Sequence, residues 1–180
     1  PMGSEFSAVG SPRIQNAAGG TANIEEICIV RGLETVYRFP EEMPRNRKKL
    51  RIKWSGALIR GRARIARWDG RLQVDGVPIR AVEPFAFDSA AEYVTSWDVD
   101  HVEWKSVTSG DEDGLILEFD REPEGKLHFD SEQTTFSLPL DQLGDGVHCV
   151  EVGGEELRVE IEFMPLGATA KRAEFVWSDS

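Results

Sequence analysis

Histidine and cysteine, which most often carry nucleophilic or metal chemistry, are scarce in this sequence of 180 residues. The three histidines are His101, His128 and His148, and none belongs to a His-x-His or His-Glu-x-x-His pattern. A nucleophilic serine or cysteine needs a base within reach, and the Gly-x-Ser-x-Gly turn that often carries such a serine does not occur. We therefore expect no enzyme activity from this chain, with no catalytic residue, no transition-metal site and no cofactor.

Two cysteines, Cys28 and Cys149, each lie among β-branched apolar residues. This context predicts buried free thiols, which behave as small apolar side chains. A disulfide between the two stays open as the alternative, because spacing along the sequence does not give their separation in space.

An acidic cluster, Asp111-Glu112-Asp113-Gly114, carries the hard oxygen donors that calcium prefers. Asp111 and Asp113 are therefore candidate calcium ligands, with Asp98 or Asp100 as a further donor. The cluster lacks the full ligand pattern of an EF-hand loop, and a solvated hairpin tip would also explain it.

Three arginines, Arg60, Arg62 and Arg64, alternate along an expected strand, which would place them on one face. They could form an anion-binding stripe. Alternatively, they are the solvent face of a strand that pairs with acidic neighbours such as Glu160 and Glu162.

Five tryptophans raise the question of a sugar-stacking platform. Tryptophans of β-sandwiches are usually largely buried, so we expect most of them in the core. Trp97, between Ser96 and Asp98, is the best candidate for an exposed ring that binds a ligand.

The net charge of −11 is unevenly distributed. Residues 38–71 hold twelve Lys and Arg against three Asp and Glu, a balance of +9, whereas residues 72–180 hold seven against twenty-five, a balance of −18. An acidic protein does not attract the phosphates that dominate nucleic-acid affinity. We expect the basic stretch to pair with acidic strands of the same molecule.

Short runs with apolar residues at every second position predict an all-β, antiparallel β-sandwich, either immunoglobulin-like or jelly-roll-like. The clearest runs are 50–54, 114–119 and 157–163, and only 140–143 suggests a helical turn. Four Asp-Gly pairs are expected to close tight hairpins between strands; they begin at residues 69, 75, 113 and 145. Further strands are expected within 24–30, 35–39, 58–68, 72–74, 79–83, 101–107, 126–129, 134–138, 147–152 and 173–177.

The linker-like stretch 40–46 predicts a small N-terminal β unit at 11–44 and a main sandwich at 45–180. Residues 1–10 fit a cloning remnant or a linker. The sequence contains no apolar run long enough to cross a membrane and no signal peptide at its start, so it indicates no compartment.

Two stretches, 62–76 and 104–110 followed by Asp113-Gly114, together with 20–25 and 29–32, resemble a known family. It is the β-rich C-terminal region of a bacterial family of uncharacterised proteins, in which a PHP-type metal-dependent hydrolase domain precedes the β region. The metal ligands that the resemblance implies belong to that preceding domain, so no catalytic residue carries over to this chain.

The resemblance implies a piece of a larger protein, with the preceding hydrolase domain as its partner. We therefore expect a non-catalytic accessory β-sandwich. The alternative is a carbohydrate-binding or calcium-dependent binding module. Nucleic acid and membranes are not expected as partners, whereas self-association through an exposed sheet edge stays open.

Overall fold

The computed structural model describes residues 13–19, 27–39, 45–60, 63–153, 157–166 and 172–178. The chain divides into two compact units. One combines Pro1–Pro44 with Pro165–Ser180, and the other is Arg45–Met164. The main domain expected at 45–180 therefore differs from the observed unit at its C-terminal end.

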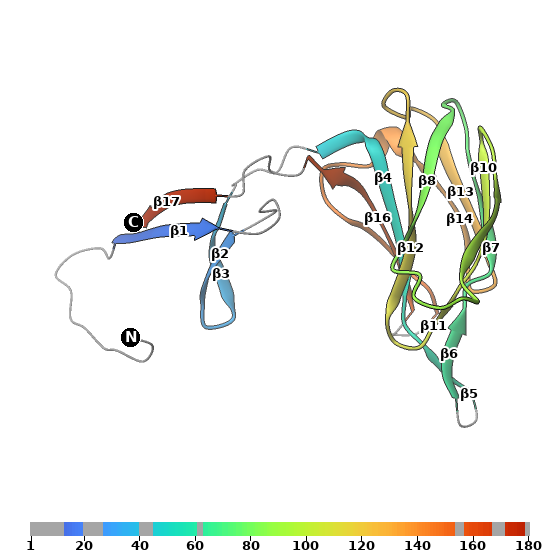
Figure 1. Cartoon of the computed structure of the whole chain (residues 1–180), viewed down its shortest axis with the longest axis horizontal. Helices are drawn as coiled ribbons and strands as arrows, with labels where there is room; N and C mark the ends of the chain where they lie inside the picture. The colour runs from blue at the N-terminus through green and yellow to red at the C-terminus, as the bar shows by residue number, and fades with distance from the viewer. Residues whose placement is uncertain are drawn as a thin grey trace. The chain divides into compact units, whose positions relative to one another are not determined.

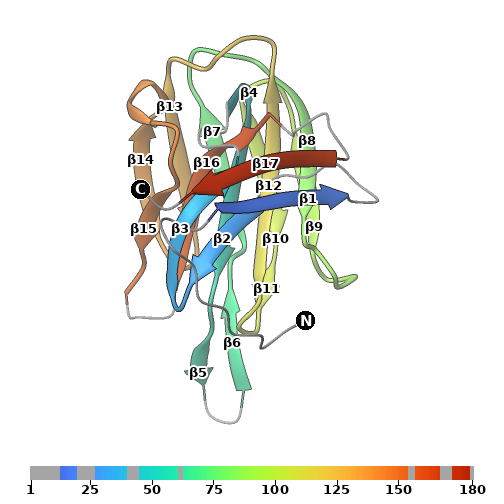
Figure 2. The same ribbon diagram turned by 90° about the vertical axis from the view of Figure 1, so that its left-hand side faces the viewer.

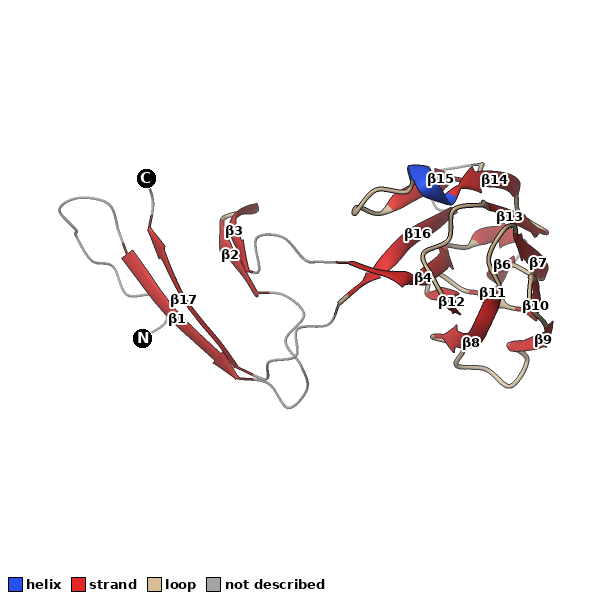
Figure 3. Cartoon of the chain, turned by 90° about the horizontal axis from the view of Figure 1, so that it is seen from above, coloured by secondary structure: helices blue, strands red, loops and turns tan. Residues whose placement is uncertain are grey.

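The Arg45–Met164 unit is an antiparallel β-sandwich, as the sequence predicts. Its two layers are five-stranded sheets, in the orders β14-β13-β7-β10-β9 and β15-β16-β4-β12-β8 (Figures 1 and 3). The first contains β7 (Gly70–Val74), β9 (Tyr93–Trp97), β10 (His101–Lys105), β13 (Lys126–Ser131) and β14 (Thr135–Pro139). The second contains β4 (Arg45–Ser55), β8 (Ile79–Phe85), β12 (Glu112–Phe119), β15 (His148–Glu151) and β16 (Arg158–Pro165).

A smaller sheet of the same unit has the order β11-β6-β5. It is made of β5 (Leu58–Arg60), β6 (Ala63–Arg67) and β11 (Val107–Thr108). Within the described residues, helix is limited to one 3₁₀ turn, η1 (Leu140–Gln142), where the sequence predicts a helical turn (Figure 3). No helix of the described part has the length and apolar character needed to span a membrane.

The core lies between the two layers and follows the alternation of the strands. β4 contributes Leu50, Ile52 and Trp54, all fully buried, because every second residue of a strand faces the same side. Trp54 stacks on Trp104 of β10 with ring centroids 4.9 Å apart. The remaining aromatic neighbours of this cluster are Trp68, Phe87, Phe129 and Phe136.

The four Asp-Gly pairs do not close the tight hairpins that the sequence predicts. Three of them lie in connections that lead from one sheet to another, at Asp69, Asp75 and Asp145. The fourth pair, Asp113-Gly114, lies inside β12, where Gly114 is opposite Lys53 of β4. Glycine is required there because a Cβ atom would lie 2.3 Å from the carbonyl oxygen of Ile52.

The other unit contains two pairs of strands. β1 (Arg13–Gly19) and β17 (Arg172–Ser178) pair antiparallel from Arg13 opposite Ser178 to Gly19 opposite Arg172, and they lie side by side in Figure 2. β2 (Ile27–Arg31) and β3 (Glu34–Phe39) form a hairpin whose turn contains Gly32 with a φ of 66°. The sequence predicts β2, β3 and β17 but neither β1 nor, in the sandwich, β9.

Candidate functional site

The outer face of the sheet β14-β13-β7-β10-β9 carries short polar side chains in two cross-strand rows. Residues directly opposite one another on antiparallel strands share a face of the sheet. The first row crosses all five strands and contains Ser96, Glu103, Arg71, Asp130 and Thr135. The second row crosses four strands and contains His101, Gln73, His128 and Ser137. We call these nine residues the polar face.

A hollow of about 600 Å³ lies over the polar face. Every residue of the polar face except Ser96 lines it, and Asp100 and Phe136 contribute to its wall. A second hollow of about 350 Å³ shares Arg71, Glu103 and Asp130 with the first. The short side chains thus leave room for a ligand above the sheet.

Hydrogen bonds within the rows fix the orientation of several groups. Arg71 Nε lies 3.2 Å from Asp130 Oδ2, and Thr135 Oγ1 donates to Asp130 Oδ1 at 2.7 Å. The two ring nitrogens of His128 lie 2.7 Å from Ser137 Oγ and 3.0 Å from Asp75 Oδ2. The polar face therefore presents donors and acceptors that are already oriented before a ligand arrives.

An aromatic side chain borders the polar face at its β9 edge. Tyr93 is opposite Lys105, which follows Glu103 at the next outward position of β10. The register places Tyr93 on the same side of the sheet as the two rows, and its side chain is exposed. A tyrosine ring offers both apolar surface for stacking and a hydroxyl for hydrogen bonding.

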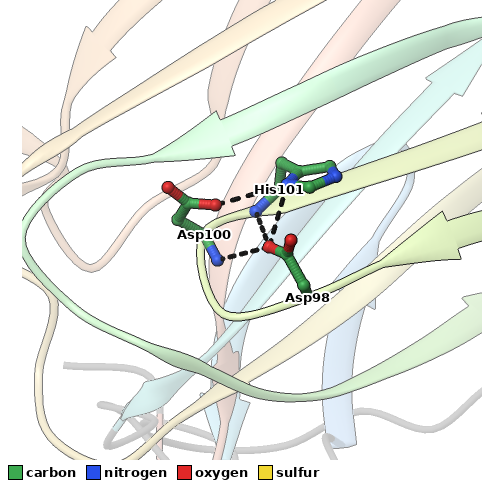
Figure 4. A group of neighbouring side chains, drawn as sticks. All are labelled: Asp98, Asp100 and His101. Atoms are coloured by element: carbon green, nitrogen blue, oxygen red, sulfur yellow. Dashed lines mark hydrogen bonds and ion pairs between the residues drawn. The ribbon is translucent and has the colours of Figure 1, made fainter.

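The turn between β9 and β10 brings Asp98, Asp100 and His101 together, with one potential metal-ligand atom from each within 4.8 Å of the others (Figure 4). No other such group of three occurs among the residues that the structure describes. His101 Nδ1 lies 2.8 Å from Asp98 Oδ1 and 3.3 Å from Asp100 Oδ1. These residues supply the oxygen and nitrogen donors that a divalent cation would need.

The same oxygen of Asp98 already has a structural role in the turn. It accepts the backbone N–H groups of Asp100 at 3.1 Å and His101 at 3.3 Å. The hydrogen bond from the backbone of Asp100 is the main cause that lowers the pKa of Asp98. The three side chains are sufficiently explained as a cap of the turn, which ends next to the polar face.

The expected calcium ligand Asp113 lies in the core and not at a solvated hairpin tip, which corrects that expectation. Its exposed fraction is 1%, because it occupies the same inward face of β12 as Leu115. Ser106 Oγ donates to Asp113 Oδ2 at 2.5 Å and accepts the indole N–H of Trp54 at 2.8 Å. Asp111 is exposed, and its Oδ1 accepts the backbone N–H of Ser109 at 2.6 Å.

Burial raises the pKa of Asp113 to about 7, against the opposing effect of the hydrogen bond from Ser106. The nearby carboxylates of Glu92, Asp111 and Asp88 raise it further. Near neutral pH a substantial fraction of Asp113 is therefore protonated, and calcium would have to displace that proton to bind.

Arg60 and Arg64, expected to alternate along one strand, lie on the two strands of a hairpin instead. β5 ends at Arg60 and β6 begins at Ala63, with Arg60 opposite Ala63 and Arg64 opposite Ile59. Arg62 lies outside the described residues. Arg64 is exposed and lines a hollow of about 350 Å³ that Asp111 also lines, so the structure brings these two candidates to one place.

The expected acidic partners, Glu160 and Glu162, bind cations of the neighbouring strand β4. Glu162 Oε2 lies 2.9 Å from Arg45 Nη1 and its Oε1 lies 2.5 Å from Arg51 Nη2, whereas Glu160 lies 3.1 Å from Lys53. Burial alone would lower the pKa of Lys53, but hydrogen bonds and charges of two glutamates raise it. We call this outer surface of β4, β12 and β16 the ion-pair face; it contains Arg45, Lys49, Arg51, Lys53, Glu112, Glu118, Glu160 and Glu162.

The tryptophans divide as the sequence predicts. Trp54, Trp68 and Trp104 are buried, whereas Trp97 has an exposed fraction of 46%. Trp97 is not among the residues that line the hollow over the polar face. The side chain of Trp177 lies outside the described part.

The prediction of two buried thiols is wrong for Cys149, which is exposed on the edge strand β15, and Cys28 is half-buried. The two cysteines are not joined by a disulfide. An apolar neighbourhood in sequence does not bury an edge-strand residue on the outward side, where Cys149 is opposite Glu160.

The polar face was not predicted as a site from the sequence. The sequence does hold a sign of it, because polar residues alternate with apolar ones in β7, β10, β13 and β14. Apolar runs identify only the inward residues of such strands. No family model, no curated protein and no solved structure matches the chain, so the arrangement of its own residues carries the interpretation.

Proposed function

We propose that the Arg45–Met164 unit is a non-catalytic accessory module that binds carbohydrate on the polar face. The observation that carries the proposal is the hollow of about 600 Å³ over two rows of oriented hydrogen-bonding side chains. Sugar hydroxyls both donate and accept hydrogen bonds, so they suit a surface that mixes Arg71 and Gln73 with carboxylates and hydroxyls. Tyr93 at the border could stack on a sugar ring.

The difference between the two outer faces supports the choice of the polar face. On the ion-pair face, long side chains reach one another and neutralise their charges across strands. On the polar face, the side chains are shorter and leave a hollow. Binding sites are typically concave surfaces with a few well-placed polar groups.

The test is a titration of the whole chain with neutral, amino and acidic oligosaccharides, followed by Gln73→Ala and His128→Ala. Loss of a hydrogen bond at a ligand typically costs about 0.5–1.5 kcal/mol, so each variant should bind about two- to tenfold more weakly. Lys49→Ala on the ion-pair face is the matched control and should bind like the wild type. No binding of any oligosaccharide, or binding that both variants leave unchanged, would reject the proposal.

A second role, packing against a preceding PHP-type hydrolase domain of the same protein, rests on the family resemblance. One observation favours it, namely that the β9–β10 hairpin exposes Trp97 and Val99 to solvent. Its test is the upstream reading frame and, where that encodes a histidine-rich domain, co-purification of that domain with the wild type and a Trp97→Ser variant. Equal recovery with both proteins would exclude Trp97 from such a contact.

A further inference from the structure

We infer that the polar face selects carbohydrates that carry a primary amine over those that carry a carboxylate. This inference rests on the proposed function and names the ligand class of the same site. It depends on the charged side chains that line the hollow and on which of the carboxylates form no ion pair with a lysine or arginine.

The lining of the hollow is acidic. It contains the carboxylates of Asp100, Glu103 and Asp130 and the guanidinium of Arg71, so its formal balance is −2 with neutral histidines. Arg71 is already engaged by Asp130 at 3.2 Å. The negative charge that remains therefore lies on the β10 side of the hollow.

Glu103 and Asp100 have no lysine or arginine within ion-pair distance in the described part of the chain. Glu103 accepts a hydrogen bond from Ser96 Oγ at 3.1 Å, and Asp100 lies 3.3 Å from the His101 ring. By contrast, each glutamate of the ion-pair face binds at least one lysine or arginine. The protein thus neutralises the carboxylates of one face and leaves two on the other.

An amine is the group that these carboxylates can bind best. A protonated amine has three donors and no acceptor, and a carboxylate has about four acceptor positions, of which Ser96 occupies one on Glu103. Glu103 lines the larger hollow, which no lysine lines, so an amine in that hollow lies near it. A sugar carboxylate would meet like charges in the same place, which disfavours it.

The experiment compares a chitosan hexamer with the fully acetylated chitin hexamer, which differ only in the amines, and with oligogalacturonate and spermidine. Titrations are run at about pH 6.5 and low salt, where a large share of the sugar amines is protonated and the carboxylates are ionised. EDTA is present so that no divalent cation bridges the acidic groups. An exposed ion pair contributes about 0.2–1 kcal/mol, so two carboxylates should give chitosan about a two- to thirtyfold preference. Salt should reduce this preference.

Glu103→Gln should weaken the binding of chitosan more than the binding of chitin, because only chitosan loses a charged partner. Glu118→Gln, which removes a carboxylate from the ion-pair face, is the control and should change neither affinity. Equal affinities for the two hexamers would overturn the inference and leave the proposed function standing, whereas no binding of either hexamer or of oligogalacturonate would reject both. Spermidine that binds as tightly as chitosan and with the same dependence on Glu103 would show that the site binds amines without a sugar.

Discussion

At the residue scale, the most unusual group in the sandwich is the buried carboxyl of Asp113. Its oxygen accepts the hydroxyl of Ser106, which in turn accepts the indole N–H of Trp54. Hydrogen bonds through Ser106 therefore connect the neighbouring strands β12 and β4 inside the core. A buried polar group is tolerated when its partners are present, and it becomes costly when it ionises.

We predict that Asp113→Asn raises the stability of the protein above pH 7. The folded-state pKa of Asp113, about 7, is above its ordinary value of 3.8, so between these values the folded state holds a proton that the unfolded state has released. Stability therefore falls as pH rises through this window and then stays lowered. Asparagine cannot ionise, so the variant should gain about 1–3 kcal/mol above pH 7.

The measurement is chemical unfolding of both proteins from about pH 3 to about pH 8, a range that brackets both pKa values, 3.8 and about 7. Because other groups titrate equally in both proteins, the difference between their unfolding free energies isolates Asp113. Asp141→Asn, at an exposed position that is not among the carboxylates raising the pKa of Asp113, should leave the wild-type curve unchanged. Parallel curves for the wild type and Asp113→Asn would contradict the prediction.

Glu162 is the residue on which the ion-pair face depends most, because its carboxylate is buried between Arg45 and Arg51. Glu162→Ala would leave two cations without their anion and should cost about 2–4 kcal/mol of unfolding free energy. Glu118→Ala removes an exposed partner of Lys49 and should cost about 1 kcal/mol or less. Equal losses in urea unfolding would show that burial of Glu162 is not the deciding factor.

At the element scale, the alternation of apolar residues predicts most of the strands but not the chemistry between them. The runs at 50–54, 114–119 and 157–163 lie in β4, β12 and β16, with their apolar sides in the core. The same period, continued through polar residues, places Ser106 and Thr108 on the buried side with Trp104. An inward aspartate or serine interrupts the run of apolar residues. The apolar pattern therefore predicts a strand that is shorter than the buried side of the real one.

The missed elements have a similar explanation. β9 is a short edge strand with four of its five residues exposed. Because few of its side chains are buried, its sequence does not alternate between apolar and polar residues as an inner strand does. The Asp-Gly pairs do not close hairpins, because local turn preference does not determine which strands are neighbours in the sheets. The rows of the polar face depend on strand order and register, and neither follows from one strand at a time.

Gly114 shows how closely β12 approaches β4. We predict that Gly114→Ala lowers the unfolding free energy by about 1–3 kcal/mol, because the added methyl group would overlap the backbone of Ile52. Gly144→Ala is a matched control, since no atom lies within 4 Å of the position of its Cβ atom. The control should stay within about 0.5 kcal/mol of the wild type. Thermal unfolding of the two variants is the check, and similar melting temperatures would refute the close approach.

At the scale of the whole molecule, positive and negative side chains are concentrated on different strands and form ion pairs where these strands are neighbours. The basic strand β4 lies between the acidic strands β12 and β16. Four of its cations bind glutamates of these two strands, namely Arg45, Lys49, Arg51 and Lys53. The basic stretch of the sequence thus pairs within the molecule at β4, a different place from the Arg60–Arg64 segment that the sequence suggested. The net charge of −11 remains for the molecule as a whole.

We therefore predict that the chain does not bind nucleic acid measurably, because its overall field repels polyanions. The check is a titration with short DNA and RNA at low salt, where such binding is strongest. Micromolar binding that weakens with salt and is lost when Arg60, Arg62 and Arg64 are changed to glutamate would disprove it. The same variant should keep its affinity for oligosaccharides if the polar face is the ligand site.

The boundaries of the sandwich have a mechanical consequence. The chain enters the unit at Arg45, the first residue of β4, and leaves it after Met164 near the end of β16, the strand next to β4. Arg45 Nη1 lies 3.1 Å from the carbonyl oxygen of Phe163, so both ends of the unit meet at one end of the same strand pair. Tension on the flanking segments would pull the two strands apart from that end and break their hydrogen bonds one after another. We expect this sandwich to open at low force in a single-molecule pulling experiment, well below a sandwich whose terminal strands are loaded in shear, and it is therefore not suited to bearing load.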